Sequence, residues 1–485
     1  MLNRRDILLA GAAGAAGAAG LLGGCAAPGD VRRSRAARHN PPAPWLDELE
    51  RRSFQYFWDT ADARTGLVPD RWPQPSFASV AAVGFGLSAY CIGAARGWVT
   101  REQARGRCLA TLRFFHQAVQ GPQAQGVSGY KGFFYHFLDI PSGHRHGRNE
   151  LSTVDTALFL AGALHAQAFF TAADGAEREI RDLAQALYER VQWPWAQARG
   201  AAISHGWHPE SGFIAYDWKG YNEALLVYLL ALGSPTYPVG ADAYEAWAST
   251  YPGSWGVAHG QAHGQAQGQA HLRFASFFGH HFTHAWVDMQ GLADAFLRSK
   301  GLDYFENTRR ATLAQHAYAL HNPEGWAGYG ADLWGVTASD GPADVQRAFG
   351  GRMRQFRSYA GRGMGGAAAY DDGTIAPYGA GCSLPFAPEL VLPGLEAMWR
   401  RPHATGRYGF FAVNPSFSFA DVALLHGRLV PGAGWVDTDF LGIEVGPLLL
   451  MLANHRDDQI WRVMRGQPWL LRGLQRAGFR GGWMG

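Results

Sequence analysis

From Trp45 to its end, the chain repeats one pattern: apolar residues at helical spacing, followed by loops rich in Gly, Pro, Trp and Asp. The first repeat places Leu46, Leu49 and Phe57 on one face of a helix. Few segments alternate apolar and polar residues with period two, so a large β-sheet is not expected. The pattern predicts an all-α fold for residues 45–485.

Several of the predicted helices also carry start signals. Ser79 precedes one apolar segment as a helix cap, and Thr100 with Gln103 three residues later forms a capping-box pattern. Further helices are predicted over residues 152–170, 177–192, 221–233, 284–301, 306–322, 386–401 and 443–456. Many helices joined by long loops indicate an α/α toroid whose site is built from loops on one face.

The composition limits the classes of protein to consider. Hydrophobic residues make up 47% of the chain and charged residues 17%, which supports a large core and excludes global disorder. The net charge is +3 with acids and bases mixed, so nucleic acid is not an expected partner. The 18 Trp, 18 Tyr and 28 Phe either fill the core or, in part, line a cleft that stacks on sugar rings.

Residues 1–25 have the features of a bacterial export signal: a basic start, an apolar stretch and a small-residue end. Arg4 and Arg5 lie in "NRRDILL", which looks like a twin-arginine motif. The stretch ends in "LGGC", which resembles a lipobox, so Cys25 is predicted to be lipidated. A plain cleaved signal and a membrane anchor are the alternatives, but the Ala/Gly-rich run is weakly hydrophobic for a spanning helix.

Residues 26–44 are predicted to be a flexible tether between the anchor and the folded domain, because they are small, basic and Pro-containing. Ala27, rather than Asp, stands two residues after Cys25. By resemblance to Gram-negative lipoproteins, this favours the outer membrane. We therefore expect a lipid-anchored protein that faces the periplasm.

The cysteines and histidines favour neither a disulfide framework nor a metal centre. Three cysteines follow Cys25, and Cys91 and Cys108 flank helical patterns, where buried thiols are more common than a bridge. Residues 257–271 form a low-complexity insertion, which would not hold zinc ligands rigidly. The histidines in and after this insertion are His259, His263, His271, His280, His281 and His284. No metal or organic cofactor is expected.

Seven stretches of the sequence, taken in chain order, resemble one bacterial family. They are "TGLVPDR" (65–71), "ELSTVDTALFLAGAL" (150–164), "YNEALLVYLLALGSPTYP" (221–238), "WGVTASDGP" (334–342), "DDGTIAPYGAG" (371–381), "FAPELVLPGL" (386–395) and "GIEVGPLLLMLANHR" (442–456). Together they resemble the glucoamylase-like domain family, which includes the endo-β-1,2-glucanases of glycoside hydrolase family 144. The resemblance covers essentially all of residues 45–480. It implies an (α/α)6 barrel that acts on glucans through a cleft on one face.

Glu223 is the first candidate for catalysis, because glycosidic cleavage needs carboxylates as acid and base or nucleophile. Asn222 is expected to cap a helix and to place Glu223 in its first turn. The helix dipole would favour the charged carboxylate, whereas burial against Trp218 and Tyr221 would favour the protonated acid. A first-turn glutamate that only serves the dipole is the alternative, but the resemblance places this glutamate in the substrate cleft.

Asp155 and Glu150 are the next catalytic candidates. Asp155 lies close to an otherwise apolar helix face, where an unpartnered carboxylate is unfavourable. In the alternative interpretation, Ser152 or Thr153 caps the helix and Asp155 pairs with that cap. The resembling glucanases carry acidic residues implicated in catalysis in this region, and this chain has Ser152 where some of them have Asp.

Further side chains are candidates for binding substrate. Asp340 follows Trp334 and could position a sugar hydroxyl or a water, although an Asx-turn explains it equally well. The predicted substrate-binding residues are Trp218, Tyr221, Arg71, Asp340, Trp334, His284, Trp286, Tyr408, Lys131 and Glu444.

The predicted function is hydrolysis of a glucan, most plausibly β-1,2-linked, by Glu223 with Asp155 or Glu150. No dinucleotide-binding glycine loop or serine-hydrolase elbow stands in its required context. The alternatives are a transglycosylase or lyase on the same barrel, and a non-catalytic glycan-binding lipoprotein. The departure at Ser152 motivates the non-catalytic alternative.

Overall fold

The computed structural model describes residues 43–258, 269–364 and 369–485. The predicted export signal, the lipidation site Cys25 and the tether as far as residue 42 lie outside the described residues. Within the described residues, no helix combines the length and apolar character that a membrane crossing requires.

One group of helices is buried on all sides. It comprises α3 (Val80–Ala95), α5 (Thr153–Phe169), α7 (Leu225–Gly233), α10 (Phe282–Trp286), α13 (Pro377–Gly381) and α15 (Gly442–Asp457). These segments are apolar around most of their circumference, and every residue of α7 is buried. A helix that is apolar all round belongs inside a protein, so these helices form the inner layer.

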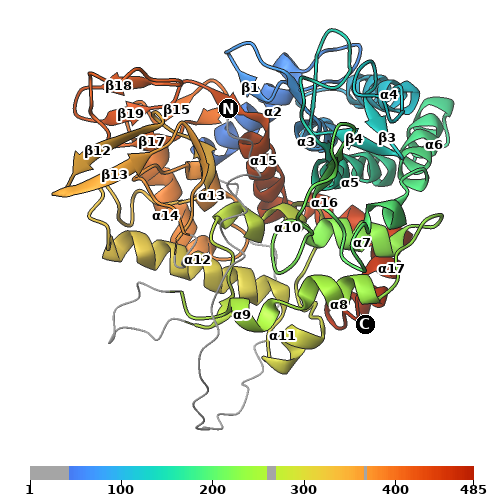
Figure 1. The fold of residues 1–485 in the computed structure, drawn as a ribbon. Coiled ribbons are helices and arrows are strands. Elements are labelled where there is room, and N and C mark those ends of the chain that lie inside the picture. The colour runs from blue at the N-terminus through green and yellow to red at the C-terminus, as the bar shows by residue number, and fades with distance from the viewer. Residues whose placement is uncertain (1–42, 259–268, 365–368) are drawn as a thin grey trace.

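A second group of helices surrounds the first and exposes one face to solvent. It comprises α2 (Pro44–Thr60), α4 (Arg101–Gln117), α6 (Gly175–Glu189), α12 (Tyr304–His321), α14 (Pro388–Arg400) and α17 (Pro468–Arg476). In Figure 1, α5 and α15 lie in the middle of the molecule, whereas α4, α6, α12 and α17 lie at its periphery. The two layers confirm the predicted all-α toroid.

Helices α3 and α5 cross in close contact inside the barrel. A Cβ added to Gly84 would lie 2.2 Å from the carbonyl oxygen of Leu158, and one added to Gly162 would lie 1.9 Å from that of Gly84. Both glycines are therefore required for backbone-to-backbone packing rather than for an unusual backbone conformation. This crossing sets the position of α5, whose first turn carries Asp155.

Short antiparallel strands join the loops at the N-terminal ends of inner helices. The largest sheet has the order β3 (Gly129–Tyr130), β4 (Phe133–Tyr135), β6 (Leu151–Ser152), β7 (Gly206–His208) and β8 (Gly212–Phe213). β2 (Ala78–Ser79), β6 and β20 (Phe440–Leu441) lead directly into α3, α5 and α15. The strands thus fix these helix starts, where candidate site residues are concentrated.

The remaining strands form small ribbons, many of which lie in the upper part of Figure 1. β1 (Arg71–Trp72) pairs with β20, β2 with β5 (Phe137–Leu138), β9 (Trp255–Gly256) with β10 (His271–Leu272), and β11 (Ala338–Asp340) with β14 (Tyr359–Gly361). β12 (Val345–Phe349) pairs with β13 (Arg352–Phe356), β15 (Thr405–Gly406) with β16 (Gly409–Phe410), and β19 (Gly434–Val436) with β17 (Val413–Asn414) and β18 (Arg428–Val430).

Some of the predicted helix caps are present in the structure, and one is not. Ser79 caps α3 by accepting a hydrogen bond from the backbone N–H of Ala82, and Thr100 with Gln103 forms the capping box of α4. The prediction that Asn222 caps α7 is wrong, because α7 begins at Leu225. Asn222 instead accepts from the N–H of Ala224 in the preceding turn, so Glu223 lies before the helix.

The predicted helix over residues 284–301 is also wrong. The structure has two short helices there, α10 and α11 (Ala295–Ser299), joined by an irregular segment. Gly291 in that segment has φ +73°, and an added Cβ would lie 2.8 Å from the Cα of Gly482. The chain turns here to pass the C-terminal segment, which the local apolar spacing does not encode. The other short helices are α8 (Asp242–Ala248), α9 (Tyr251–Ser254) and α16 (Gln459–Met464).

The cysteines and the insertion occupy different environments. Cys91 and Cys108 are free and buried, as predicted, and Cys382 is also free and buried. Residues 259–268 of the low-complexity insertion lie outside the described residues. The segments that flank them pair as β9 and β10, with His271 opposite Gly256.

Candidate active site

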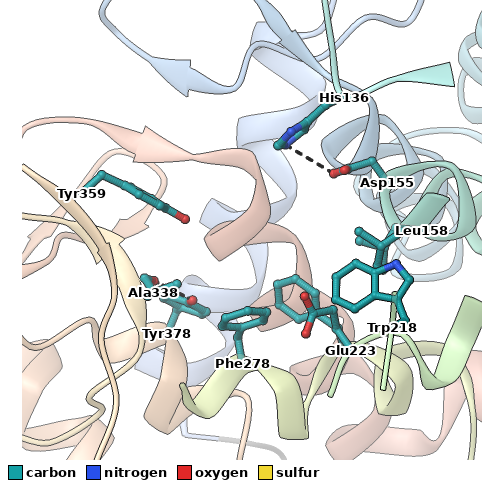
Figure 2. A pocket seen from close by; sticks show the side chains of 12 residues that line it. His136, Asp155, Leu158, Trp218, Glu223, Phe278, Ala338, Tyr359 and Tyr378 are labelled. Atoms are coloured by element: carbon teal, nitrogen blue, oxygen red, sulfur yellow. Dashed lines mark hydrogen bonds and ion pairs between the residues drawn. The ribbon is translucent and has the colours of Figure 1, made fainter. Parts of the chain in front are cut away.

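A pocket of about 560 Å³ opens where the inner helices meet the loops. Its lining comes from six parts of the structure, which are the β4–β5 junction, α5, the segment before α7, the Phe278–Phe282 region, the β11–β14 ribbon and α13. The lining residues are His136, Val154, Asp155, Leu158, Trp218, Glu223, Phe278, Phe282, Ala338, Tyr359, Gly361 and Tyr378. In Figure 2, the Glu223 carboxylate and the Tyr359 hydroxyl both point into this space.

Asp155 is held on one wall by the start of α5. Ser152 caps the helix: its hydroxyl oxygen accepts from the N–H of Asp155 at 3.0 Å, and its O–H donates to the Asp155 carboxylate. The other carboxylate oxygen lies 3.5 Å from Nε2 of His136, as the dashed line in Figure 2 shows. The predicted pairing of Asp155 with a helix cap is therefore present, and it orients Asp155 towards the pocket.

Glu150 lies behind His136 and does not line the pocket. Its carboxylate is 3.0 Å from Nδ1 of His136, and both side chains are almost completely buried. The backbone carbonyl of Glu150 also accepts from the N–H of His136 at 2.9 Å. Glu150 therefore contacts the pocket residue His136 without lining the pocket itself.

Glu223 projects from an apolar wall. It is 4% exposed, and Trp218, Phe278 and Phe282 line the pocket beside it. The indole N–H of Trp218 donates to Oγ1 of Thr153 at 2.9 Å, and its ring stacks on His205 with 3.6 Å between ring centroids. The first turn of α5 thus positions both Asp155 and the aromatic ring beside Glu223.

The opposite wall is the β11–β14 ribbon together with Tyr378. The hydroxyl of Tyr378 donates to the carbonyl of Ala338 at 2.8 Å. Burial raises the pKa of Tyr378 well above its usual value, and the nearby Glu444 carboxylate adds to this shift. Tyr378 is therefore a neutral hydrogen-bond donor across the physiological pH range.

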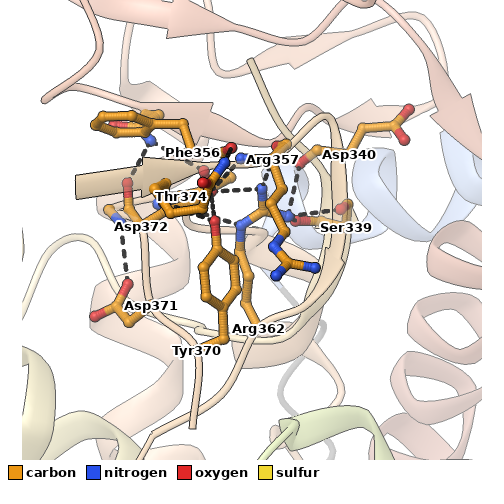
Figure 3. Close-up of polar contacts among 12 residues, drawn as sticks. Ser339, Asp340, Phe356, Arg357, Arg362, Tyr370, Asp371, Asp372 and Thr374 are labelled. Carbon is orange, nitrogen blue, oxygen red and sulfur yellow. Dashed lines mark hydrogen bonds and ion pairs between the residues drawn. The ribbon is translucent and has the colours of Figure 1, made fainter. Parts of the chain in front are cut away.

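A fully buried ion pair supports this ribbon from behind (Figure 3). The guanidinium of Arg362 donates to both carboxylate oxygens of Asp372, at 2.6 and 2.9 Å, and to the carbonyl of Ser339 at 2.7 Å. Burial favours the neutral acid, but the Arg362 charge more than offsets it and holds the pKa of Asp372 below its usual value. A buried pair of this kind fixes the ribbon that carries Tyr359 and Gly361.

Arg71 and Asp340 meet in a second polar cluster beside the ribbon. Arg71 Nη1 lies 2.7 Å from Oδ2 of Asp340 and 2.9 Å from Nε2 of His426, and Nδ1 of His426 lies 3.2 Å from Asp439. Burial raises the pKa of Asp340, although Arg71 opposes the shift. Asp340 lies two residues from Ala338 on the same strand, so both side chains emerge on one face of the ribbon.

Other predicted binding residues lie in the core. Trp286 donates to Ser88 and stacks on Phe85. Trp334 is fully buried, and its ring contacts Phe277. These environments explain the two indoles as core packing, and neither lines the pocket.

His284 and Tyr221 also lie away from the pocket lining. Both contact the hydroxyl of Thr308, at 3.0 Å from Nε2 of His284 and 3.4 Å from the Tyr221 oxygen. Burial lowers the pKa of His284 to about 3 and raises that of Tyr221 to about 12. Both side chains are therefore neutral near pH 7.

The last three predicted binding residues, Tyr408, Glu444 and Lys131, do not line the main pocket. Tyr408 and Glu444 line a smaller cavity of about 250 Å³, which shares Tyr378 with the main pocket. Lys131 lies in the β3–β4 turn with φ 58°, and its Nζ is 5.5 Å from the ring centroid of Tyr130.

Among the residues that the structure describes, two buried clusters have ligand-type atoms close enough to hold a cation. They are His136 with Glu150 and Asp155, and Asp340 with His426 and Asp439; within each, the atoms lie within 4.8 Å of one another. In the second cluster the Arg71 guanidinium already lies against Asp340 and His426. In the first, the His136 imidazole lies 3.0 Å from Glu150 and 3.5 Å from Asp155.

His136, Tyr359, Tyr378 and Phe278 line the pocket but were not predicted from the sequence. His136 stands between two strands of two or three residues each, in "FFYHFLD", where no spacing rule singles it out. Tyr359 begins β14 and Tyr378 lies in α13, both far from Glu223 in the chain. The only sequence signal for these two tyrosines is that they lie in or near stretches that resemble the family. Many other tyrosines of the chain share that signal.

Two layers of helices around a loop-built pocket that holds carboxylates and aromatic rings define an α/α-toroid protein of the carbohydrate-active type. The family model Glycoamylase, described as "Putative glucoamylase", matches residues 215–468. The chain belongs to this family, which confirms the resemblance seen in the sequence.

The relatives with a printed activity act on β-1,2-glucans. An exo β-1,2-glucooligosaccharide sophorohydrolase (non-reducing end) from Parabacteroides distasonis is 25% identical over 455 residues, which cover 89% of this chain and 57% of the relative. The chain thus spans little more than half the length of this curated relative.

Solved structures share the fold over nearly the whole chain. A protein of the same family description from Bacteroides fragilis NCTC 9343 is 27% identical, with a TM-score of 0.74 over 90% of this chain and 97% of its own. An endo-β-1,2-glucanase from Chitinophaga pinensis, in complex with sophorotriose and glucose, is 24% identical, with a TM-score of 0.74 over 90% of this chain and 98% of its own.

Proposed function

We propose that the protein is a glycoside hydrolase that cleaves β-1,2-linked glucan. The observation that carries the proposal is the placement of Glu223 and Asp155 in one aromatic-lined pocket. Glycosidic cleavage requires such a pair of carboxyl groups. Family membership and the β-1,2-glucan activities printed for the relatives support this linkage over others.

The two carboxyl groups differ in their surroundings, which suggests different roles. Glu223 projects into the pocket beside aromatic rings, so it is placed to act on the leaving oxygen. The Asp155 carboxylate accepts a hydrogen bond from the Ser152 hydroxyl and lies 3.5 Å from the His136 imidazole, so it is suited to accept a proton from water. Trp218 supplies an aromatic surface beside both groups.

The proposal includes export and lipid anchoring through Cys25. The twin-arginine pattern and the "LGGC" sequence support it. Metabolic labelling with a radioactive fatty acid tests this part: the wild-type protein is expected to carry label in the membrane fraction. A Cys25→Ala variant that keeps the label, or a wild-type chain without label, would contradict lipidation at this residue.

The activity is tested by incubating the chain that lacks residues 1–25 with β-1,2-, β-1,3-, β-1,4- and α-1,4-glucans. We expect new reducing ends from the β-1,2-glucan. Products longer than the substrate would indicate a transglycosylase, and unsaturated products a lyase. Binding without any new reducing end would indicate a glycan-binding protein and overturn the proposal.

A further inference from the structure

We propose that Tyr216 forms an additional sugar-binding position, where its ring stacks on a glucosyl unit of a glucan chain that extends out of the pocket. This inference rests on the proposed glucan hydrolysis and adds to it a residue that determines how well long chains bind. Tyr216 is not among the residues that line the pocket, and it is 45% exposed.

Three aromatic side chains form a row from the pocket wall to the surface. The Trp218 ring lines the pocket, and the His205 ring stacks on it with 3.6 Å between ring centroids. The Tyr216 ring follows, with its centroid 6.5 Å from that of His205. Exposure rises along the row, from 2% for Trp218 and 7% for His205 to 45% for Tyr216. The row therefore connects the pocket wall to solvent.

Backbone pairing fixes the order of these rings. Ser204 and Asp217 are partners in an antiparallel bridge. His205 and Tyr216 are therefore opposite one another, and the N–H of His205 donates to the carbonyl of Tyr216 at 3.1 Å. Tyr216 and Trp218 are two residues apart in an extended segment, so their side chains project from the same face. One pair of segments thus places all three rings side by side.

The row also has a fixed position relative to the Asp155 carboxylate. The hydroxyl of Thr153, in the first turn of α5, donates to the carbonyl of His205 at 2.9 Å. The same hydroxyl oxygen accepts from the indole N–H of Trp218 at 2.9 Å. Asp155 follows two residues after Thr153 in that turn. A sugar on the Tyr216 ring would therefore be held at a constant offset from the carboxyl groups of the pocket.

Continuity with the pocket distinguishes Tyr216 from an ordinary exposed ring, because single exposed apolar side chains are common. Tyr237 is such an ordinary case. It is 44% exposed and follows the C-terminal end of α7, whereas Glu223 precedes the N-terminal end of that helix. A tyrosine at the pocket margin offers an apolar face to the C–H groups of a sugar and a hydroxyl that stays in water.

The test compares steady-state kinetics of the full chain on linear β-1,2-glucan and on the shortest β-1,2-glucooligosaccharide that it cleaves. For Tyr216→Ala, we expect KM for the long chain to rise about two- to tenfold through loss of one ring contact, with kcat changed less than about twofold. KM for the shortest substrate should not change, because that substrate occupies the pocket alone.

Two further variants control for the hydroxyl and for exposure. Tyr216→Phe keeps the ring and should retain the wild-type KM for the long chain. Tyr237→Ala removes an equally exposed ring at the other end of α7 and should match the wild type on both substrates. A rise in KM for Tyr216→Phe as large as that for Tyr216→Ala would contradict stacking on the ring.

Binding gives a readout that does not depend on turnover. Calorimetric titration of Glu223→Gln with linear β-1,2-glucan measures Kd in the absence of cleavage. Adding Tyr216→Ala to this variant should raise Kd by the same factor as KM, because the ring contact is made in the bound state before any bond is broken.

The outcomes separate this inference from the proposed function. An unchanged KM for the long chain in Tyr216→Ala, or an equal rise for both substrates, would overturn the additional position while wild-type hydrolysis stands. A change of oligomeric state in Tyr216→Ala, measured by sedimentation, with KM unchanged would assign the ring to a contact between copies of this chain. A wild-type chain that neither cleaves nor binds β-1,2-glucan would overturn the proposed function, and this inference with it.

Discussion

At the residue scale, Ser152 performs two tasks that can be separated. It caps α5 and it holds the Asp155 carboxylate. Ser79 caps α3 in the same way, by accepting from Ala82, but it is not hydrogen-bonded to a pocket carboxylate. The two serines therefore form a natural pair for comparing stability with activity.

We expect Ser152→Ala and Ser79→Ala to lower the free energy of unfolding by a similar amount, about 1 kcal/mol each, because each removes one helix cap. Only Ser152→Ala should also lower kcat, because Asp155 loses an orienting donor. Urea denaturation and initial rates of glucan cleavage give the two quantities. Equal rates in the two variants would show that Ser152 matters only to the helix.

His165 provides a pH-dependent test of burial. It is fully buried in α5, and burial lowers its pKa to about 3. The unfolded chain takes up a proton near pH 6.5, so the folded state loses stability as the pH falls from about 6.5 to about 3. This loss amounts to about 2 kcal/mol at pH 5.

Removing the His165 imidazole should therefore raise the free energy of unfolding, relative to the wild type, only at acidic pH. We expect His165→Leu to gain stability relative to the wild type between pH 7 and pH 5, measured by urea denaturation at both values. His116→Gln, on the exposed face of α4, should follow the wild type. If His165→Leu and wild type lose stability in parallel, the buried imidazole is not neutral in the folded protein.

At the scale of elements, the α3–α5 crossing controls where Asp155 lies. Gly162→Ala would force the two backbones apart, because its Cβ would overlap the carbonyl oxygen of Gly84. We expect a loss of about 1–3 kcal/mol in unfolding free energy and a lower kcat as α5 shifts. Thermal melting measures the loss of stability, and initial rates of glucan cleavage measure the change in kcat.

Gly106 in α4 is the control for this substitution. Nothing lies within 4 Å of a Cβ added there, so Gly106→Ala should raise stability by about 0.5–1 kcal/mol through the higher helix propensity of Ala. A Gly162→Ala variant as stable as wild type would refute backbone-to-backbone packing at this crossing.

The helices were largely predictable from the sequence, for local reasons. Periodicity and caps such as Thr100 with Gln103 depend on neighbouring residues only. The start of α7 and the break at Gly291 were not predictable, because a turn before the helix and the C-terminal segment determine them. Strands of two residues are too short for an alternating pattern to register.

The site was predictable only in part. Asp155 and Glu223 are carboxyl residues beside helix starts, and Trp218 precedes Glu223 closely in sequence, so local patterns single them out. Trp286 and Trp334 show the limit of this reasoning, because an indole beside a motif can equally fill the core. His136 joins the pocket through pairing of β4 with β6, a contact between segments that the sequence does not display.

At the scale of the whole molecule, the toroid brings six parts of the structure to one pocket. The short strands hold the helix starts, the glycine crossing sets α5, and the Arg362–Asp372 pair supports the opposite wall. The rigid parts of the fold thus lie behind the pocket, and the carboxyl groups project from helix starts and loops. This division accounts for the positions of Asp155 and Glu223 on different elements.

The most direct test of this account is the initial rate of reducing-end release from linear β-1,2-glucan by Glu223→Gln and Asp155→Asn, with Glu245→Gln as control. Glu245 is exposed on α8. We predict a loss of about 10²–10⁴-fold in kcat for each pocket variant, with glucan binding retained and the control unchanged. Wild-type rates in either pocket variant would contradict the two-carboxylate mechanism.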